Sequence, residues 1–203
     1  MNKENQKQRY LNIAILICIY LVISGIPFHY FIDNQIVIDI INIVLKIAFL
    51  VFAIYYINKY QLEKPKYEKV RIKHLLFIPF LVICISNLIA CFIFKYQQTD
   101  NQIKVYQIII DIFSCMLVAI CEELCFRVVL HDEIRKNNNM LKSILLSSAI
   151  FGLAHLLNIS SIGSIVPSLI QVVYSFGLGL ILALVYSISN NYILPIIIHL
   201  LFN

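Results

Sequence analysis

Charged residues are scarce in this chain of 203 residues. Asp, Glu, Lys and Arg make up 13% of it, and hydrophobic residues make up 61%, whereas about a quarter of an ordinary soluble domain is charged. A soluble domain of this size cannot bury so much apolar surface, but a lipid bilayer accepts it. Tryptophan is absent, so tyrosine, with 12 copies, must supply most of any aromatic belt. The composition therefore excludes an ordinary soluble domain and predicts an integral membrane protein.

Cysteine pairs with metal-ligand spacing are also missing. All six cysteines lie inside apolar runs, and no two of them have the CxxC spacing. Cysteine in such surroundings usually behaves as a small hydrophobic residue. The sequence therefore indicates neither a disulfide framework nor a thiolate metal site.

Seven apolar segments follow one another along the chain, and a helix needs about 20 residues to cross the hydrocarbon core. The segments are residues 11–32, 36–57, 74–94, 105–130, 142–158, 165–188 and 192–203. Most of them reach or approach that length, and the last is short. We therefore expect an all-α fold, a polytopic transmembrane bundle of about seven to eight helices.

The basic residues are concentrated in three of the segments between these apolar runs. The N-terminal tail contains three Lys and Arg, the 58–73 loop six, and the 131–142 link three, out of 16 in the chain. These connections alternate to the same side of the membrane, so the positive-inside rule places the N-terminus in the cytoplasm. This distribution accounts for the net charge of +5 as a topology signal, and we exclude nucleic acid as a partner.

Charged side chains are expected to be rare inside membrane helices, yet the fourth segment contains four of them: Asp111, Glu122, Glu123 and Arg127. Each costs on the order of 3 kcal/mol to insert, so each needs a partner. Glu123 and Arg127 are four residues apart on one helical face and are expected to form an ion pair. Glu122 points about 100° away from Glu123, which leaves it without a charge partner on its own helix.

Two histidines lie in other apolar segments, His155 in the fifth and His199 in the seventh. Because hydrocarbon solvates neither imidazole nor carboxylate, we expect Glu122, His155 and His199 to converge on one polar cavity and share a water molecule. A carboxylate in such a cavity can act as the general base that removes a proton from water. The amide of Asn203, one turn after His199, can steady that histidine or the reacting carbonyl.

The same side chains leave the role of a metal open. Two imidazoles and a carboxylate with an open fourth position form a catalytic zinc arrangement, in which Glu122, His155 and His199 would bind one divalent metal ion. Without a cofactor, the imidazoles would hold the water or donate to the developing oxyanion. The sequence does not choose between the two chemistries.

Three motifs occur in this order on successive apolar segments: Glu122-Glu123-x-x-x-Arg127, Phe151-x-x-x-His155 and His199-x-x-x-Asn203. Each motif alone is weak, but the ordered set is specific. Together they resemble the signature motifs of the CAAX-protease and bacteriocin-processing (CPBP or Abi) family, over roughly residues 105–203. The resemblance implies an intramembrane endopeptidase, regarded in this family either as a metalloprotease or as a glutamate-dependent protease.

The resemblance also implies a role for each motif residue. Glu122 would activate water, supported by the pair of Glu123 and Arg127. His155, one turn after Phe151, would assist the base or bind metal. In the last motif, His199 and Asn203 would stabilise the oxyanion or complete the site.

The resemblance further divides the chain into N-terminal transmembrane helices with about three spans, residues 1–104, and a catalytic helical core, residues 105–203. Bacterial members of the family are associated with peptide maturation, bacteriocin self-immunity or membrane-protein processing. The composition, rich in Ile, Lys and Asn, is typical of a low-GC bacterium. We therefore expect a multi-pass protein of a bacterial cell membrane, whose partners are membrane lipid and a peptide or protein substrate with a membrane-associated segment.

Two other functions are compatible with the same residues. A transporter would use intramembrane acids and histidines to relay protons or to bind substrate, although the chain shows no repeated halves with matched broken helices. A catalytically silent immunity protein of the same fold would keep the motifs intact, because intact motifs permit activity without proving it.

Overall fold

Every regular element in the described part of the chain is helical. The structure, a computed structural model, describes residues 3–69, 77–98, 105–159 and 163–202. The long elements are α1 (Lys3–Ser24), α2 (Gln35–Lys59), α3 (Ile78–Gln98), α4 (Val105–Glu123), α6 (Met140–Ala154), α8 (Ile165–Ser189) and α9 (Ile193–Phe202). Each of the seven predicted apolar segments overlaps one of these helices, which confirms the all-α fold.

Short helical elements connect or extend the long ones. They are η1 (Phe28–Tyr30), the π-helical segment η3 (Leu124–His131), α5 (Asp132–Asn137) and the 3-10 turn η4 (His155–Asn158). The segment η3 begins directly after α4, and η4 begins directly after α6. Both extensions matter for the site, because they change the backbone geometry beside the residues of the first and second motifs.

Among the described residues, four stretches of helix are long and apolar enough to cross a membrane: Glu4–Tyr30, Gln35–Lys59, Met140–Asn158 and Ile165–Ser189. A helix of 25 residues, the length of α2 and α8, measures about 38 Å, more than the roughly 30 Å of the hydrocarbon core. Large apolar side chains such as Val22, Val51 and Val173 point outward, where a bilayer would cover them. These features are those of a multi-pass integral membrane protein.

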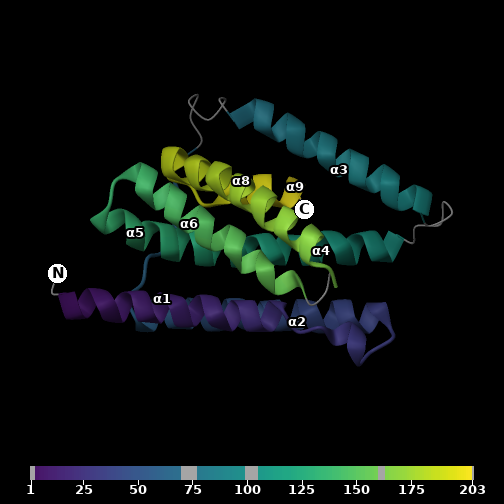
Figure 1. The fold of residues 1–203 in the computed structure, drawn as a ribbon, viewed down its shortest axis with the longest axis horizontal. Coiled ribbons are helices and arrows are strands. Elements are labelled where there is room, and N and C mark those ends of the chain that lie inside the picture. The colour runs from purple at the N-terminus through teal and green to yellow at the C-terminus, as the bar shows by residue number, and fades with distance from the viewer. Residues whose placement is uncertain (1–2, 70–76, 99–104, 160–162, 203) are drawn as a thin grey trace.

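The helices are arranged with the C-terminal half of the chain between two outer elements. In Figure 1, α1 and α2 run side by side along one edge, α3 lies along the opposite edge, and α4, α6, α8 and α9 lie between them. Helix α6 packs along α8, and glycines bring the two close together: a Cβ added at Gly152 would lie 3.0 Å from the carbonyl oxygen of Val172. Small residues allow such close packing of membrane helices.

The ends of the helices follow from local side-chain chemistry. The Asn34 side chain accepts hydrogen bonds from the first turn of α2, and the Asn139 side chain does the same for α6. Pro167 and Pro195 lie in the first turns of α8 and α9, where proline removes no helical hydrogen bond. At the end of α8, Asn190 adopts the left-handed conformation (φ 53°), which Asn tolerates better than most residues.

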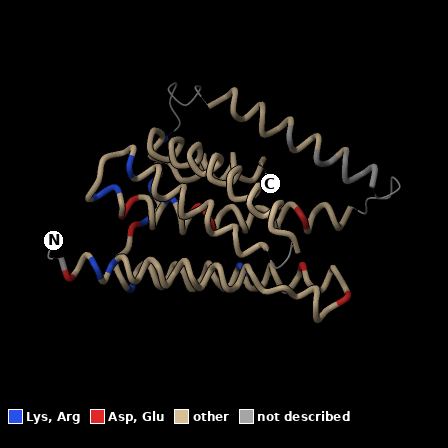
Figure 2. Tube along the Cα trace, in the orientation of Figure 1, with Lys and Arg blue, Asp and Glu red and all other residues tan. Residues whose placement is uncertain are grey.

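The predicted basic segments meet at one end of the molecule, where Figure 2 shows most of the described Lys and Arg. Arg9 of α1 makes a bidentate contact, at 3.0 and 2.8 Å, with a buried carboxylate of α5, Glu133. Lys66, from the loop after α2, lies 2.7 Å from Asp132 of the same helix. The segments therefore lie on one side, as predicted, and the assignment of that side to the cytoplasm stays a prediction.

Candidate active site

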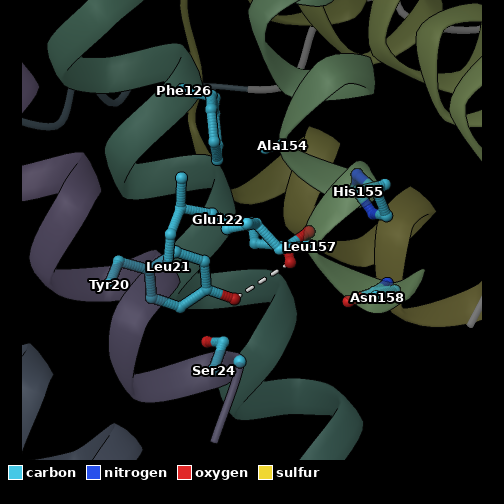
Figure 3. A pocket seen from close by; sticks show the side chains of 10 residues that line it. Tyr20, Leu21, Ser24, Glu122, Phe126, Ala154, His155, Leu157 and Asn158 are labelled. Carbon is cyan, nitrogen blue, oxygen red and sulfur yellow. Dashed lines mark hydrogen bonds between the residues drawn. The ribbon is translucent and has the colours of Figure 1, made fainter. Parts of the chain in front are cut away.

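A small cavity lies beside the end of α4 and contains the carboxyl group of Glu122. It is lined by side chains of α1, α4, η3, α6 and η4, among them His155 and Asn158 (Figure 3). Its volume of about 40 Å³ exceeds the roughly 10–15 Å³ that one water molecule needs. The structure thus brings a carboxylate and an imidazole from different helices to one water-sized space.

Both oxygens of the Glu122 carboxylate face polar groups from distant parts of the chain. The Tyr20 hydroxyl donates a hydrogen bond of 2.9 Å to Oε1. Nε2 of His199 lies 3.5 Å from Oε2. The side chain is 13% exposed, so it is mostly enclosed by protein but open to the cavity. These two contacts of Glu122 come from α1 and α9.

His199 lies between the two consecutive glutamates. Its Nδ1 is 2.9 Å from Oε1 of Glu123, which is fully buried, and its Nε2 faces Glu122. Since α9 packs against α4, one imidazole reaches both carboxylates. His199 is not among the residues that line the cavity but lies behind Glu122. It therefore orients the two acids in this structure, and its role at the oxyanion stays a prediction.

Arg127 is buried beside these acids and is held mainly by charge and by an aromatic ring. Its Nε lies 3.1 Å from Oε2 of Glu123, an ion-pair contact that lacks hydrogen-bond geometry, and among the described residues its guanidinium nitrogens have no hydrogen-bond partner. The guanidinium stacks over Phe151 at 4.4 Å from the ring centroid, a favourable cation–π contact. The spacing of Glu123 and Arg127 thus brings them together, as helix geometry requires.

Phe151 is the common neighbour of the charged and imidazole groups. It is fully buried, and its ring meets His155 and His199 edge-on, with centroid distances of 4.9 and 5.9 Å. On its other side it is the nearest neighbour of Gly179, where a Cβ would lie only 3.1 Å from Cδ1 of the ring. A change in how α6 packs on α8 would therefore move Phe151, and with it the polar residues that its ring contacts.

His155 is oriented by the backbone that precedes it. Its Nδ1 lies 2.9 Å from the carbonyl oxygen of Phe151, and because a carbonyl only accepts, Nδ1 carries the proton in this contact. In the neutral ring, Nε2 then presents its lone pair. The change from α-helix to the 3-10 turn η4 occurs at this residue. His155 therefore offers an acceptor at the cavity.

Two features of the site were missed in the sequence. The π-helical segment η3 starts after Glu123, and such segments are frequent at functional sites, yet nothing in its residue pattern distinguishes it from an α-helix. Tyr20 was missed because it lies in an apolar segment outside the motifs. A buried phenol usually has a hydrogen-bond partner, so a tyrosine in the middle of a span was the available signal. Asn203 lies outside the described residues.

The described part of the chain contains no group of side chains arranged as a metal site. A catalytic zinc site takes three protein ligands. Within residues 3–69, 77–98, 105–159 and 163–202, no three His, Cys, Asp or Glu side chains are grouped so that they could hold a metal ion. Both ring nitrogens of His199, moreover, face carboxylate oxygens. Binding of a divalent metal ion therefore stays a prediction.

Comparison with protein families identifies the family of the C-terminal half. The family model described as "Rce1-like: Type II CAAX prenyl endopeptidase Rce1-like" matches residues 104–203. These residues contain all three motifs and begin with the connection to α4. No curated protein and no solved structure matches the chain.

Proposed function

Residues 104–203 form a domain of the Rce1-like family of type II CAAX prenyl endopeptidases, and from this membership we propose that the protein hydrolyses peptide bonds within the membrane by a water molecule that Glu122 activates. One observation supports the proposal above the others: Glu122 and His155, from different helices, line one cavity with room for water. The family match alone implies an endopeptidase, and this geometry supports Glu122 and His155 as the residues that act on the water.

In the proposed first step, water in the cavity attacks the carbonyl carbon of the peptide bond. The carboxylate of Glu122 takes one proton of the water, and Nε2 of His155 accepts a hydrogen bond from the other. A bond forms between the water oxygen and the carbonyl carbon, while the electron pair of the C=O bond moves to its oxygen. The amide of Asn203, from the last motif, is proposed to stabilise this oxyanion.

In the second step, the tetrahedral intermediate breaks down. Its oxyanion re-forms the C=O bond, the C–N bond breaks, and the proton held by Glu122 passes to the leaving nitrogen, so that Glu122 is again a carboxylate. His199 and Glu123 keep the carboxyl group of Glu122 in place during both transfers, because the imidazole lies between the two acids. Since the described donor set does not fit a metal ion, we propose a glutamate-dependent protease without one.

The proposed substrate is a peptide or protein with a membrane-associated segment. The cavity lies between α1 and η4, and its lining combines Glu122 and Asn158 with apolar Leu21 and Leu157. A peptide that reaches it must leave water, which favours an apolar or lipid-anchored chain. We propose that the reaction serves peptide maturation or bacteriocin self-immunity in a bacterium.

The experiment compares purified wild-type protein with Glu122→Gln and His155→Ala in lipid nanodiscs. Each is incubated with a library of membrane-associated peptides, with and without a prenylated C-terminal cysteine, and products are identified by mass spectrometry. We expect cleavage by the wild type, its loss in Glu122→Gln, and a reduction of about 10²–10⁴-fold in His155→Ala, the usual contribution of a general acid or base.

A matched control removes a carboxylate elsewhere. Glu4→Gln changes an exposed residue at the start of α1, about 24 Å along the helix from Tyr20, and should cleave like the wild type. Equal cleavage by wild type and Glu122→Gln would contradict the proposed mechanism. If neither cleaves, but both protect cells from a bacteriocin, the silent immunity function is the better description.

A further inference from the structure

We propose that Tyr20 of α1 is a positioning residue for the water-activating carboxylate, so that the active site extends into the half of the chain that the family match does not cover. The proposal rests on the proposed function, because it assigns Tyr20 a role through Glu122. The juxtaposition that supports it is the hydrogen bond of 2.9 Å from the Tyr20 hydroxyl to Oε1 of Glu122, between residues 102 positions apart in the chain.

Packing holds the Tyr20 side chain in one orientation. It is 1% exposed, and its ring packs against Phe49 of α2 with the centroids 5.2 Å apart. The ring is therefore held between its own helix α1 and the neighbouring α2. Figure 3 shows the hydroxyl reaching across to the carboxyl group of Glu122 at the wall of the cavity.

The hydrogen bond distinguishes the two oxygens of the carboxylate. Oε1 accepts from Tyr20, while Oε2 lies on the side of His199, at 3.5 Å from Nε2. A carboxylate that keeps only the longer contact is free to turn about its last torsion angle. Because a general base must lie within hydrogen-bond reach of the proton it takes, and misplacement by 1 Å can cost about a hundredfold in rate, such a turn slows the first step.

A purely structural role would explain the same contact differently. Any acceptor satisfies a buried phenol, so loss of the hydroxyl would then lower stability without a specific effect on turnover. The chain contains a matched case: Tyr186 is also buried, at 2% exposed, and its hydroxyl donates a hydrogen bond of 2.8 Å to the carboxylate of Asp132, outside the cavity. Tyr186→Phe therefore removes a phenol hydroxyl that is also buried and also bonded to a carboxylate, but away from the cavity.

The kinetic test compares Tyr20→Phe with Tyr186→Phe in nanodiscs, on a peptide that the wild type cleaves. For Tyr20→Phe we expect kcat to fall by about ten- to a hundredfold, the effect of losing one hydrogen bond to a charged group, with KM unchanged because the substrate is still bound. Tyr186→Phe should keep the kcat of the wild type. An unchanged kcat in Tyr20→Phe, or an equal loss in both variants, would overturn the positioning role.

Infrared spectroscopy reports the hydrogen bond without requiring activity. The carboxylate stretch of Glu122 should differ between wild type and Tyr20→Phe, and this difference should vanish when both proteins also carry Glu122→Gln. Absence of the difference band would overturn the contact itself. If Tyr20→Phe does not fold, 3-fluorotyrosine at position 20 keeps the ring and strengthens the donor, and it should shift the same band in the opposite direction.

The two readouts separate the failure of this inference from the failure of the proposed function. A wild type that cleaves no more than Glu122→Gln would overturn the proposed function and the positioning role with it, while the infrared band would still report the Tyr20 contact. A wild type that cleaves, together with a Tyr20→Phe variant of equal kcat, would overturn only the inference about Tyr20.

Discussion

Adding one methyl group at Gly179 should disturb the site from a distance, whereas the same change at Gly177 should not. Both glycines lie in α8 and are two residues apart. An added Cβ at Gly179 would lie 3.1 Å from Cδ1 of Phe151 and 3.2 Å from Cβ of Ser148, while at Gly177 it would meet no atom within 4 Å. The pair therefore isolates packing against α6 from the other effects of replacing glycine by alanine.

The magnitude follows from these distances. Carbon atoms in favourable contact are about 3.5–4.0 Å apart, so α6 and α8 must separate by roughly 0.5 Å, and overpacking of this kind typically costs about 1–3 kcal/mol. Alanine also favours the helix by up to about 1 kcal/mol over glycine. That gain is common to both variants and cancels in their difference, so Gly179→Ala should be less stable than Gly177→Ala by about 1–3 kcal/mol.

The assay is unfolding by dodecyl sulfate in mixed micelles, followed by circular dichroism because the chain contains no tryptophan. Turnover is measured in parallel on a cleaved peptide. Because Phe151 supports both Arg127 and His155, Gly179→Ala should also lower kcat, by about tenfold for a shift of a fraction of an ångström. Equal stability and equal kcat in the two alanine variants would refute the argument that Phe151 couples helix packing to the site.

Three further predictions concern charge and metal. Burial acts to raise the pKa of Glu133, but hydrogen bonds and charges from Arg9 and Lys136 outweigh it and hold the pKa below its ordinary value of 4.5. The ionised Glu133 therefore stabilises the folded state above that pH, and this contribution is lost as the pH falls through the lowered pKa. Melting curves from pH 7 to pH 3 should show this acid sensitivity in the wild type and less of it in Glu133→Gln, and parallel curves would contradict it. Arg127→Lys should destabilise the protein by about 2 kcal/mol, because an ammonium loses the planar stacking on Phe151; a variant that melts like the wild type would show that this stacking adds nothing. Treatment with EDTA or phenanthroline should leave peptide cleavage unchanged, whereas loss of cleavage that added zinc restores would show that a metal takes part.

The sequence predicted most of the fold because membrane insertion is decided locally. Most of the apolar segments are long enough by themselves to require a helix, since no water is present to satisfy their backbone groups. The Glu123 and Arg127 contact was predictable for a similar reason, because a spacing of four residues is fixed by helix geometry. The presence of Glu122, His155 and His199 on three separate apolar helices also indicated a shared polar site.

Contacts between helices were not predictable in this way. The bond from Tyr20 to Glu122 depends on how α1 and α2 pack against α4, and nothing in the first apolar segment indicates which face turns inward. The position of His199 between two glutamates depends on the angle at which α9 meets α4. The π-helical segment η3 was equally invisible, because the difference from an α-helix lies in backbone hydrogen bonds and not in residue type.

By itself, the sequence determined that the protein is helical and lies in the membrane. It also identified the acids and imidazoles that need a partner there, because the cost of exposing a polar group to lipid is a property of each residue alone. The tertiary structure decided which partners those groups found. Glu122 meets a phenol from α1 and an imidazole from α9 because packing in lipid is selected by the fit of side chains across helices, and no spacing along one helix contains that information.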